Sequence, residues 1–141
     1  MPEPDNRFAE TLLESMPDAV IYCNAQGIMR YWNKGAERIF GFDASEAIGQ
    51  SLDMIVPEKL RHHHWEGYEK TMRTGETRYG GGDLLAVPAI RKDGTRISTE
   101  FTIVPFRDES GRMIGIAAIM RDITKRFEEM KALRAAAAAK S

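Results

Sequence analysis

The chain contains three histidines, and they are consecutive: His62, His63 and His64. A histidine side chain can ligate a metal, transfer a proton near neutral pH, or simply pack. Neighbouring positions on a helix point in different directions, so these three imidazoles cannot converge on one ion. Because Cys23 is the only cysteine, a tetrahedral zinc site is also disfavoured. A single neutral imidazole, however, is sufficient to hold haem iron from one side of an apolar pocket.

Helix geometry distinguishes the three histidines. On a helix that starts at Leu60 and turns by about 100° per residue, His64 falls near the centre of one arc. His62 falls on the opposite side and His63 at the margin. The inward arc consists of Leu60, His64, Gly67, Tyr68 and Thr71. We therefore expect His64 to face the interior, His62 to be solvated, and Gly67 to leave a gap that a flat ligand can approach.

The elements that would position this helix follow from the apolar pattern and the turn residues. We expect helices over residues 7–16, 33–54 in short pieces, 57–73 and from 122 onward. We expect strands over residues 19–23, 28–32, 84–91, 97–107 and 113–120. Turn residues at 24–27, 93–94 and 108–112 join strand pairs. Two strands, a helical crossover and three further strands indicate an α+β fold with a five-stranded antiparallel sheet and helices on one face.

Length and composition limit the classes of function that the chain can have. The 141 residues suit a single domain, and 20 basic against 21 acidic side chains argue against a nucleic-acid surface. No apolar run reaches the roughly 18 residues of a membrane span, and the first residues lack the apolar core of a signal peptide. We therefore expect a cytoplasmic protein. The chain has no phosphate-binding glycine loop and no evident acid–base pair, so we expect a binding domain and not an enzyme.

Five short motifs resemble those of PAS domains. They are residues 13–20 (LESMPDAV), 32–42 (WNKGAERIFGF), 46–52 followed by 56–58 (EAIGQSL, VPE), 91–94 (RKDG) and 121–124 (RDIT). Their order and spacing extend the resemblance over about residues 7–124. It implies a flanking helix in residues 1–16, a sensory domain in 17–124 and a signalling helix in 125–141. PAS domains sense small molecules, redox state or light, and they often dimerise.

Within that family, the helix resembles the corresponding helix of haem-binding oxygen-sensor PAS domains. Those domains carry Arg-x-x-His with the histidine as proximal iron ligand, and the matching residues here are Arg61 and His64. Counting back from Tyr68 instead places Trp65 at the ligand position. Leu85 falls where those sensors carry a distal arginine. The resemblance thus implies b-type haem in a pocket lined by His64, Trp65, Tyr68, Leu85, Phe101, Ile103, Ile114 and Ile116.

The apolar distal side affects which ligand is expected. Leucine donates no hydrogen bond, so oxygen should be held less well than in arginine-bearing sensors, which favours carbon monoxide, nitric oxide or iron redox state as the signal. Two alternatives remain open. One is a non-covalent flavin, with Trp65 as stacking partner, or a small organic ligand. The other is a haem-free dimerisation module.

The two flanking helices are candidate dimer surfaces. Ile123, Phe127, Met130 and Ala137 recur at spacings typical of a short coiled-coil seam. Phe8 and Leu12 form a second apolar stripe near the N-terminus. We therefore expect a homodimer that passes its signal to a downstream domain or protein.

Overall fold

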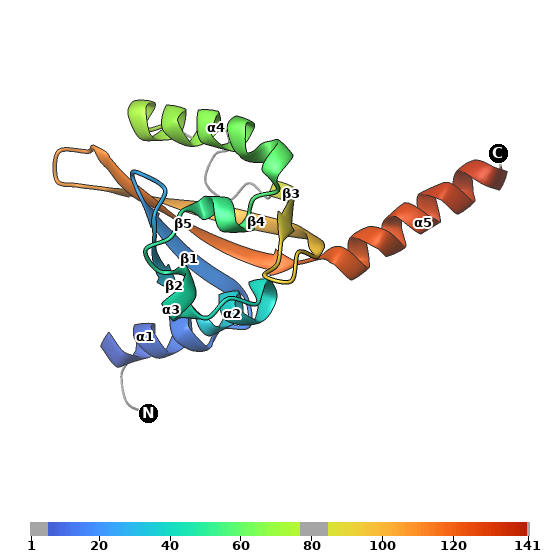
Figure 1. Cartoon of the computed structure of the whole chain (residues 1–141), viewed down its shortest axis with the longest axis horizontal. Coiled ribbons are helices and arrows are strands. Elements are labelled where there is room, and N and C mark those ends of the chain that lie inside the picture. The colour runs from blue at the N-terminus through green and yellow to red at the C-terminus, as the bar shows by residue number, and fades with distance from the viewer. Residues whose placement is uncertain (1–5, 77–84, 141) are drawn as a thin grey trace.

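The computed structural model describes residues 6–76 and 85–140 (Figure 1). Its centre is one antiparallel sheet of five strands in the order β2-β1-β5-β4-β3. The strands are β1 (Ala19–Asn24), β2 (Met29–Trp32), β3 (Leu85–Ile90), β4 (Arg96–Arg107) and β5 (Met113–Asp122). The predicted α+β class and the number and direction of the strands are therefore confirmed. Predicted strand residue 84 lies outside the described residues.

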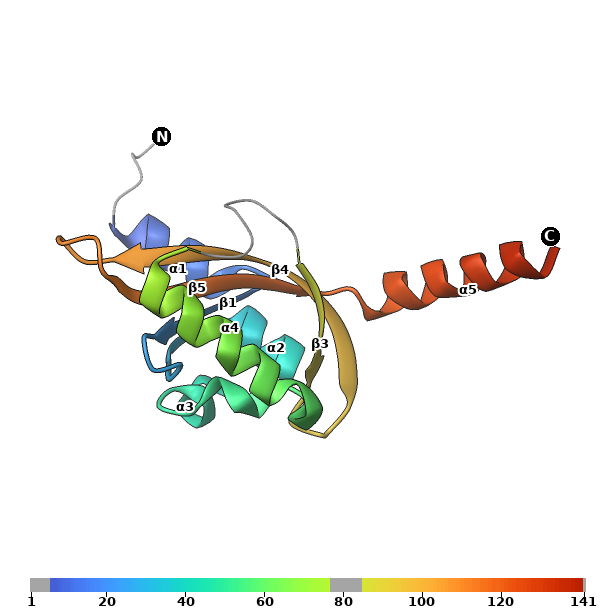
Figure 2. The ribbon, with the colours of Figure 1, turned by 90° about the horizontal axis from the view of Figure 1, so that it is seen from above.

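The helices lie mainly on one side of this sheet. They are α1 (Asn6–Ser15), α2 (Lys34–Phe40), α3 (Ala44–Ala47), α4 (Arg61–Thr74) and α5 (Thr124–Lys140), with 3-10 turns η1 (Leu52–Ile55) and η2 (Glu58–Leu60). Figures 1 and 2 show α2, α3 and α4 over one face, α1 at the opposite end of the molecule from α4, and α5 projecting away from the body. The helix predicted from residue 57 is a 3-10 turn followed by α4, so its α-helical part begins at Arg61. No helix within the described ranges is both long and apolar enough to cross a membrane.

Asn33 connects the first three elements. Its side chain is fully buried, and its Oδ1 accepts hydrogen bonds from the Val20 and Ala36 amides at 2.8 and 2.9 Å. Its Nδ2 donates to the Leu13 and Asp18 carbonyls at 2.7 and 3.0 Å. All of these groups would otherwise lack partners at the end of α1, the start of β1 and the first turn of α2. One amide therefore determines how the chain passes from α1 through β1 and β2 to α2.

The predicted turns form as their residues indicate. In the β1–β2 turn, Asn24 Oδ1 accepts from the Gln26 and Ile28 amides, both at 3.0 Å, and Gly27 has φ +76°. In the β3–β4 turn, Asp93 Oδ1 accepts from the Thr95 amide at 2.9 Å, next to a glycine with φ +85°. The left-handed backbone at these glycines is the conformation that other residues adopt at a cost.

The densest core lies between α2 and the sheet. Trp32, Phe40 and Met29 are almost completely buried there, with Ile21 and Ala36 beside them. The indole N–H of Trp32 donates to the Phe42 carbonyl at 2.9 Å, so this large side chain is buried without an unsatisfied donor. The sheet below α4 is packed differently, and the candidate site lies there.

Candidate functional site

The predicted pocket residues of the sheet come together on its helix-covered face. Across β4 and β5, Phe101 pairs with Met120 and Ile103 with Ala118, while Ile116 pairs with Cys23 of β1. Side chains alternate between the faces of a strand. The register and this alternation place Phe101, Ile103 and Ile116 on the same face as the buried Met120 and Cys23. Ile114 lies at a register shift between β4 and β5, where the regular alternation is interrupted. Leu85 pairs with Phe101 through its backbone, and its side chain is not among those described.

Burial on this face falls from one end to the other. Ile97 and Met120, at the end nearer α2, are 5% and 6% exposed. Phe101, Ile103 and Ile116 are only half-buried, and Ile114 is 42% exposed. Interior apolar side chains normally pack to high density. Their partial exposure shows that the packing of this face becomes looser toward this end of the sheet.

The inward face of α4 is rotated from the one that the sequence predicts. Tyr68 is the buried residue of this helix at 9% exposure, and Gly67 is exposed. The half-buried residues of α4 are Arg61, His64, Trp65, Thr71 and Met72. The face is therefore centred near Tyr68, with His64 to one side of the centre and Gly67 beyond its edge. The prediction started at Leu60, which lies in a 3-10 turn, where each residue rotates by about 120°.

The three histidines lie in three different environments. His62 is 89% exposed and pairs with Glu66 at 2.7 Å, one helical turn away. His63 is exposed, and His64 is half-buried. The Nδ1 atom of His64 is shielded from solvent and has no hydrogen-bond partner among the described residues. The predicted solvation of His62 is confirmed.

Burial also determines the charge of His64. Desolvation lowers the pKa of its imidazole below the ordinary value of 6.5, and the Asp53 carboxylate opposes this shift only in part. A lowered pKa keeps the ring neutral near pH 7. A neutral imidazole with an unpartnered nitrogen is the form in which histidine ligates a metal. The residue type, burial and charge of His64 therefore fit a haem ligand.

Trp65 and Tyr68 hold α4 to the neighbouring elements. The indole N–H of Trp65 donates to Asp53 Oδ1 of η1 at 2.6 Å, and the Tyr68 hydroxyl donates to the Asn24 carbonyl of β1 at 2.6 Å. A Cβ at Gly27 would lie 2.1 Å from the Trp65 ring, so only glycine permits this contact. In this arrangement the Trp65 donor is already committed to Asp53. The sequence does not predict this role of Asp53, because nothing local to it indicates a partner on α4.

The other end of α4 is held by Arg107 of β4. Its guanidinium donates to the Gly75 carbonyl at the end of α4 and, at 3.2 Å, to the Gly111 carbonyl of the β4–β5 turn. A cation at the C-terminus of a helix also interacts favourably with the helix dipole. The sequence does not predict this contact, because Arg107 and Gly75 are 32 residues apart.

Cys23 offers no reactive thiolate. Its side chain is 3% exposed on the covered face of β1, and burial raises the pKa of the thiol to about 12. A protonated thiol is a poor nucleophile and a poor metal ligand. Cys23 therefore behaves as a small apolar core residue, as the sequence analysis expects.

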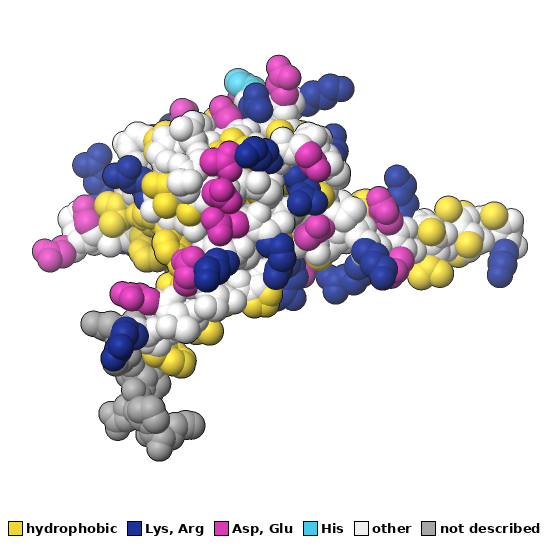
Figure 3. Space-filling model, turned by 60° about the horizontal axis from the view of Figure 1, so that its bottom comes forward, with side chains coloured by type: hydrophobic (Ala, Val, Ile, Leu, Met, Phe, Trp, Pro, Cys, Tyr) yellow, Lys and Arg dark blue, Asp and Glu magenta, His cyan; other side chains and the backbone are white. Residues whose placement is uncertain are grey.

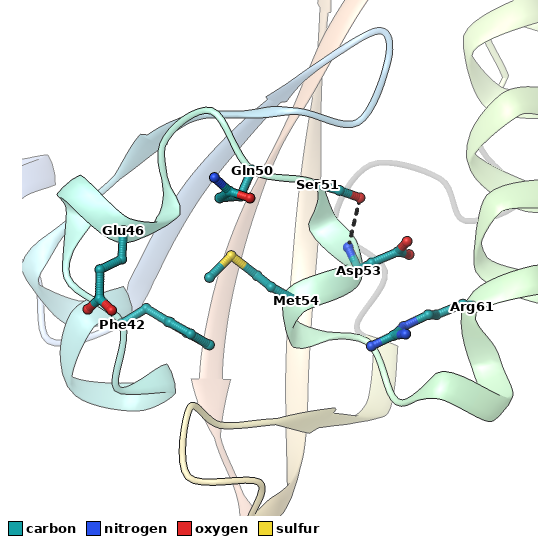
Figure 4. A pocket seen from close by; sticks show the side chains of 7 residues that line it. All are labelled: Phe42, Glu46, Gln50, Ser51, Asp53, Met54 and Arg61. Atoms are coloured by element: carbon teal, nitrogen blue, oxygen red, sulfur yellow. Dashed lines mark hydrogen bonds between the residues drawn. The ribbon is translucent and has the colours of Figure 1, made fainter.

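A separate groove of about 400 Å³ lies among the helices. Its lining consists of Phe42, Glu46, Gln50, Ser51, Asp53, Met54 and Arg61. Figure 4 shows Glu46 at one end, Asp53 and Arg61 at the other, and Phe42 and Met54 between them. No sheet residue belongs to this lining, so the groove is distinct from the space beneath α4. Asp53 connects the two regions through its hydrogen bond with Trp65.

Comparison with known proteins identifies relatives of this chain. Sensor protein FixL of Bradyrhizobium diazoefficiens is 31% identical over 115 residues, which are 82% of this chain and 22% of that protein. Oxygen sensor protein DosP of Escherichia coli K12 is 27% identical over 130 residues, which are 92% of this chain and 16% of that protein. The chain thus spans about a fifth of the length of these two relatives.

Solved structures and a family model agree with these relatives. A PAS domain from Colwellia psychrerythraea superposes with a TM-score of 0.73 at 27% identity, covering 84% of this chain and 97% of that one. An RNA-binding light-oxygen-voltage receptor has a TM-score of 0.75 at 19% identity, covering 98% of this chain and 41% of that one, and it supports the fold alone. The family model described as the PAS fold matches residues 13–128. The chain therefore belongs to the PAS family.

Proposed function

We propose that this sensory PAS domain binds b-type haem through His64, senses a diatomic gas or redox state, and relays the signal through α5. The observation that carries the proposal is the half-buried, neutral His64 imidazole, whose Nδ1 atom has no partner among the described residues. A relative of the chain is named an oxygen sensor. When bound, haem would supply an iron centre that takes up a gas ligand or changes its oxidation state.

The surrounding residues have separate roles in this proposal. His64 is the axial ligand, and its position depends on α4. Trp65 and Tyr68 hold that helix against η1 and β1 through hydrogen bonds of 2.6 Å each. The sheet face then excludes water and provides apolar contact for a porphyrin. Its pocket residues are Leu85, Phe101, Ile103, Ile114 and Ile116.

The composition of that face favours a particular class of signal. Its side chains are apolar, and the N–H of Trp65 is committed to Asp53. A bound oxygen molecule gains more from a hydrogen-bond donor than carbon monoxide does. We therefore propose carbon monoxide, nitric oxide or iron redox state as the signal, in preference to oxygen.

Hydrogen bonds at the start of α5 support the proposed relay of the signal. The Ile123 amide donates to the Ser98 carbonyl and the Ser98 amide to Thr124 Oγ1, both at 2.9 Å, so the root of α5 is bonded to β4. β5 runs directly into the same root. A movement of either strand therefore reaches α5 through short, stiff connections.

The exposed face of α5 suggests what receives the signal. Phe127, Met130 and Leu133 are 48%, 47% and 65% exposed along this helix, and α1 carries Leu12 at 53%. Large apolar side chains in an exposed stripe are typical of an interaction surface. We propose that a second copy of the chain covers them and that the dimer passes the signal to a downstream domain or protein. Leu133, which the predicted seam omitted, lies in this stripe.

Reconstitution with haem tests the proposed function. The purified chain supplied with haem should show a sharp Soret band that shifts with carbon monoxide, and His64→Ala should remove this response. His63→Ala is the matched control, because it removes an exposed imidazole from the adjacent position. An unchanged Soret band and carbon monoxide shift in His64→Ala would show that His64 is not the ligand.

A haem-free module is the second candidate. The exposed stripes of α1 and α5 support it, because they favour dimerisation whether or not a cofactor is present. If it is correct, haem titration gives no Soret shift while sedimentation still shows a dimer. Yellow absorbance and flavin fluorescence in the purified protein would instead indicate a non-covalent flavin.

A further inference from the structure

An open hollow of about 670 Å³ lies where the chain enters and leaves the PAS body. Its lining consists of Pro17, Asp18, Arg38, Ile39, Arg91, Arg121 and Asp122. These residues come from the α1–β1 connection, α2, the β3–β4 turn and the end of β5. Basic and acidic side chains are interleaved around the root of α5 (Figure 3). The hollow is distinct from the space beneath α4, because neither α4 nor His64 contributes to its lining.

The carboxylates of this hollow are already engaged. Arg121 forms an ion pair with Asp18 at 3.0 Å. Asp122 Oδ1 accepts hydrogen bonds from the Thr124 amide at 2.9 Å and from the Thr124 hydroxyl at 2.5 Å. The hollow therefore presents three guanidinium groups, and one of its two carboxylates is neutralised by one of them. The side chains that line the hollow therefore carry a net positive charge.

Among the described residues, neither of the other two arginines forms an ion pair, although the charge of Arg91 contributes, after hydrogen bonds with Thr95, to lowering the pKa of the nearby Asp93 carboxylate. Arg38 donates to the Pro17 carbonyl. Within residues 6–76 and 85–140, no carboxylate lies within ion-pair distance of Arg38 or Arg91. The Nε atom of Arg91 is shielded from solvent and has no hydrogen-bond partner there. Buried charged donors normally find an acceptor in protein, water or a bound ion, since leaving one without a partner is unfavourable.

Backbone contacts around Arg91 fix the position of this residue. The Lys92 amide donates to the Phe40 carbonyl at 2.8 Å, which anchors the β3–β4 turn to the C-terminus of α2. A Cβ at Gly41 would lie 4.0 Å from Arg91 Nη2, so the guanidinium lies against that helix end. The Arg91 side chain is thus held beside the hollow by an anchored turn, with its Nε shielded from solvent.

We propose that this hollow binds a small oxyanion of the phosphate or carboxylate class. Two or more oxygens on one centre match the planar fork of an arginine, and such charge-assisted hydrogen bonds are the strong ones. The anion would be held by Arg38 and Arg91 and would compete with Asp18 for Arg121. It would connect α2 and the β3–β4 turn to the residues from which α5 begins. Anion binding would therefore modulate the output helix without involving the haem pocket.

Isotope-labelled protein tests this directly. Inorganic phosphate is titrated into the full chain at constant ionic strength, with chloride as the exchanged ion, and backbone amide shifts are followed by NMR. A saturable shift is expected at Asp18, Ile39 and Asp122. Arg91→Gln and Arg38→Gln should each raise the dissociation constant at least tenfold. Acetate in a parallel titration distinguishes a carboxylate ligand from a phosphate ligand, and saturable binding of either supports the site.

The matched control is Arg112→Gln, which removes the same charge from the exposed β4–β5 turn. It should leave the dissociation constant within twofold of the original. The proposal is overturned if neither anion gives a saturable shift. It is equally overturned if Arg112→Gln weakens binding as much as the two hollow variants, since binding would then reflect overall charge. Two hollow variants are used so that poor folding of one leaves the test intact.

Discussion

Replacing His64 by leucine tests whether the imidazole is a metal ligand or a packed core side chain. In the haem-free protein the half-buried ring has a shielded Nδ1 without a partner among the described residues. A buried polar group in this state costs roughly 1–3 kcal/mol, and partial burial places His64 at the lower end. Leucine has a similar size and no polar atom. We therefore expect His64→Leu to raise the free energy of unfolding by about 1 kcal/mol, or Tm by roughly 3 °C.

The pH dependence of this gain provides a second measurement. Burial lowers the pKa of folded His64 below 6.5, so below that pH the unfolded chain binds the proton first. The original chain therefore loses stability as pH falls from about the unfolded-state pKa of 6.5 toward the lower folded-state pKa, and the leucine variant does not. The stability advantage of His64→Leu should grow between about pH 7.5 and about pH 5.5. Contributions from titratable groups that both chains share cancel in the comparison.

The assay is urea unfolding of haem-free protein, repeated with haem. Adding haem should raise the stability of the original chain by linkage and leave His64→Leu unchanged. His63→Leu is the control, with a change within about 0.5 kcal/mol because that side chain is exposed. The reasoning is refuted if His64→Leu destabilises the haem-free protein by 1 kcal/mol or more, since the imidazole would then be a packed core residue.

Three further predictions follow from single contacts. Tyr68→Phe removes the donor to the Asn24 carbonyl at 2.6 Å and should lower the free energy of urea unfolding by about 1 kcal/mol; no change would mean that water replaces the hydroxyl. Gly35→Ala would ordinarily favour a helix, but its Cβ would lie 2.0 Å from the Asp18 carbonyl oxygen. Calorimetry should therefore show that the free energy of unfolding falls by about 2 kcal/mol. An increase in stability would contradict the packing of α2 on β1. Leu133→Glu introduces a charge at a position of α5 where the leucine is 65% exposed. Sedimentation should show the dimer shifting to monomer, while the stability of the monomer is preserved. An unaltered dimer would exclude α5 from the interface.

Local chemistry explains why the fold was predictable. The β1–β2 turn follows from Asn24 and Gly27, and the β3–β4 turn from Asp93 and Gly94, because each needs only its own side chain and backbone. Phe101, Ile103 and Ile116, which the family resemblance assigned to one pocket, share a face of the sheet because the side-chain period of a strand is fixed. The five motifs then identified the family, which the match over residues 13–128 confirms.

The candidate site was less predictable from the sequence. The predicted face of α4 was rotated because it included Leu60, which lies in the preceding 3-10 turn, and omitted the half-buried Trp65 and Met72. The partners of Trp65 and Tyr68 lie 12 and 44 residues away. Arg107 meets the end of α4 across 32 residues. No local signal indicates such contacts, because they arise only when separate elements pack together.

The sequence by itself determined the strands, the turns, the family and which histidine is solvated, because propensity, periodicity and turn chemistry act over a few residues. Only the tertiary structure decided the state of His64 and Arg91. Each has a shielded nitrogen without a partner among the described residues. Burial and the absence of an acceptor depend on every element that packs around a side chain, and no pattern within one element carries that information.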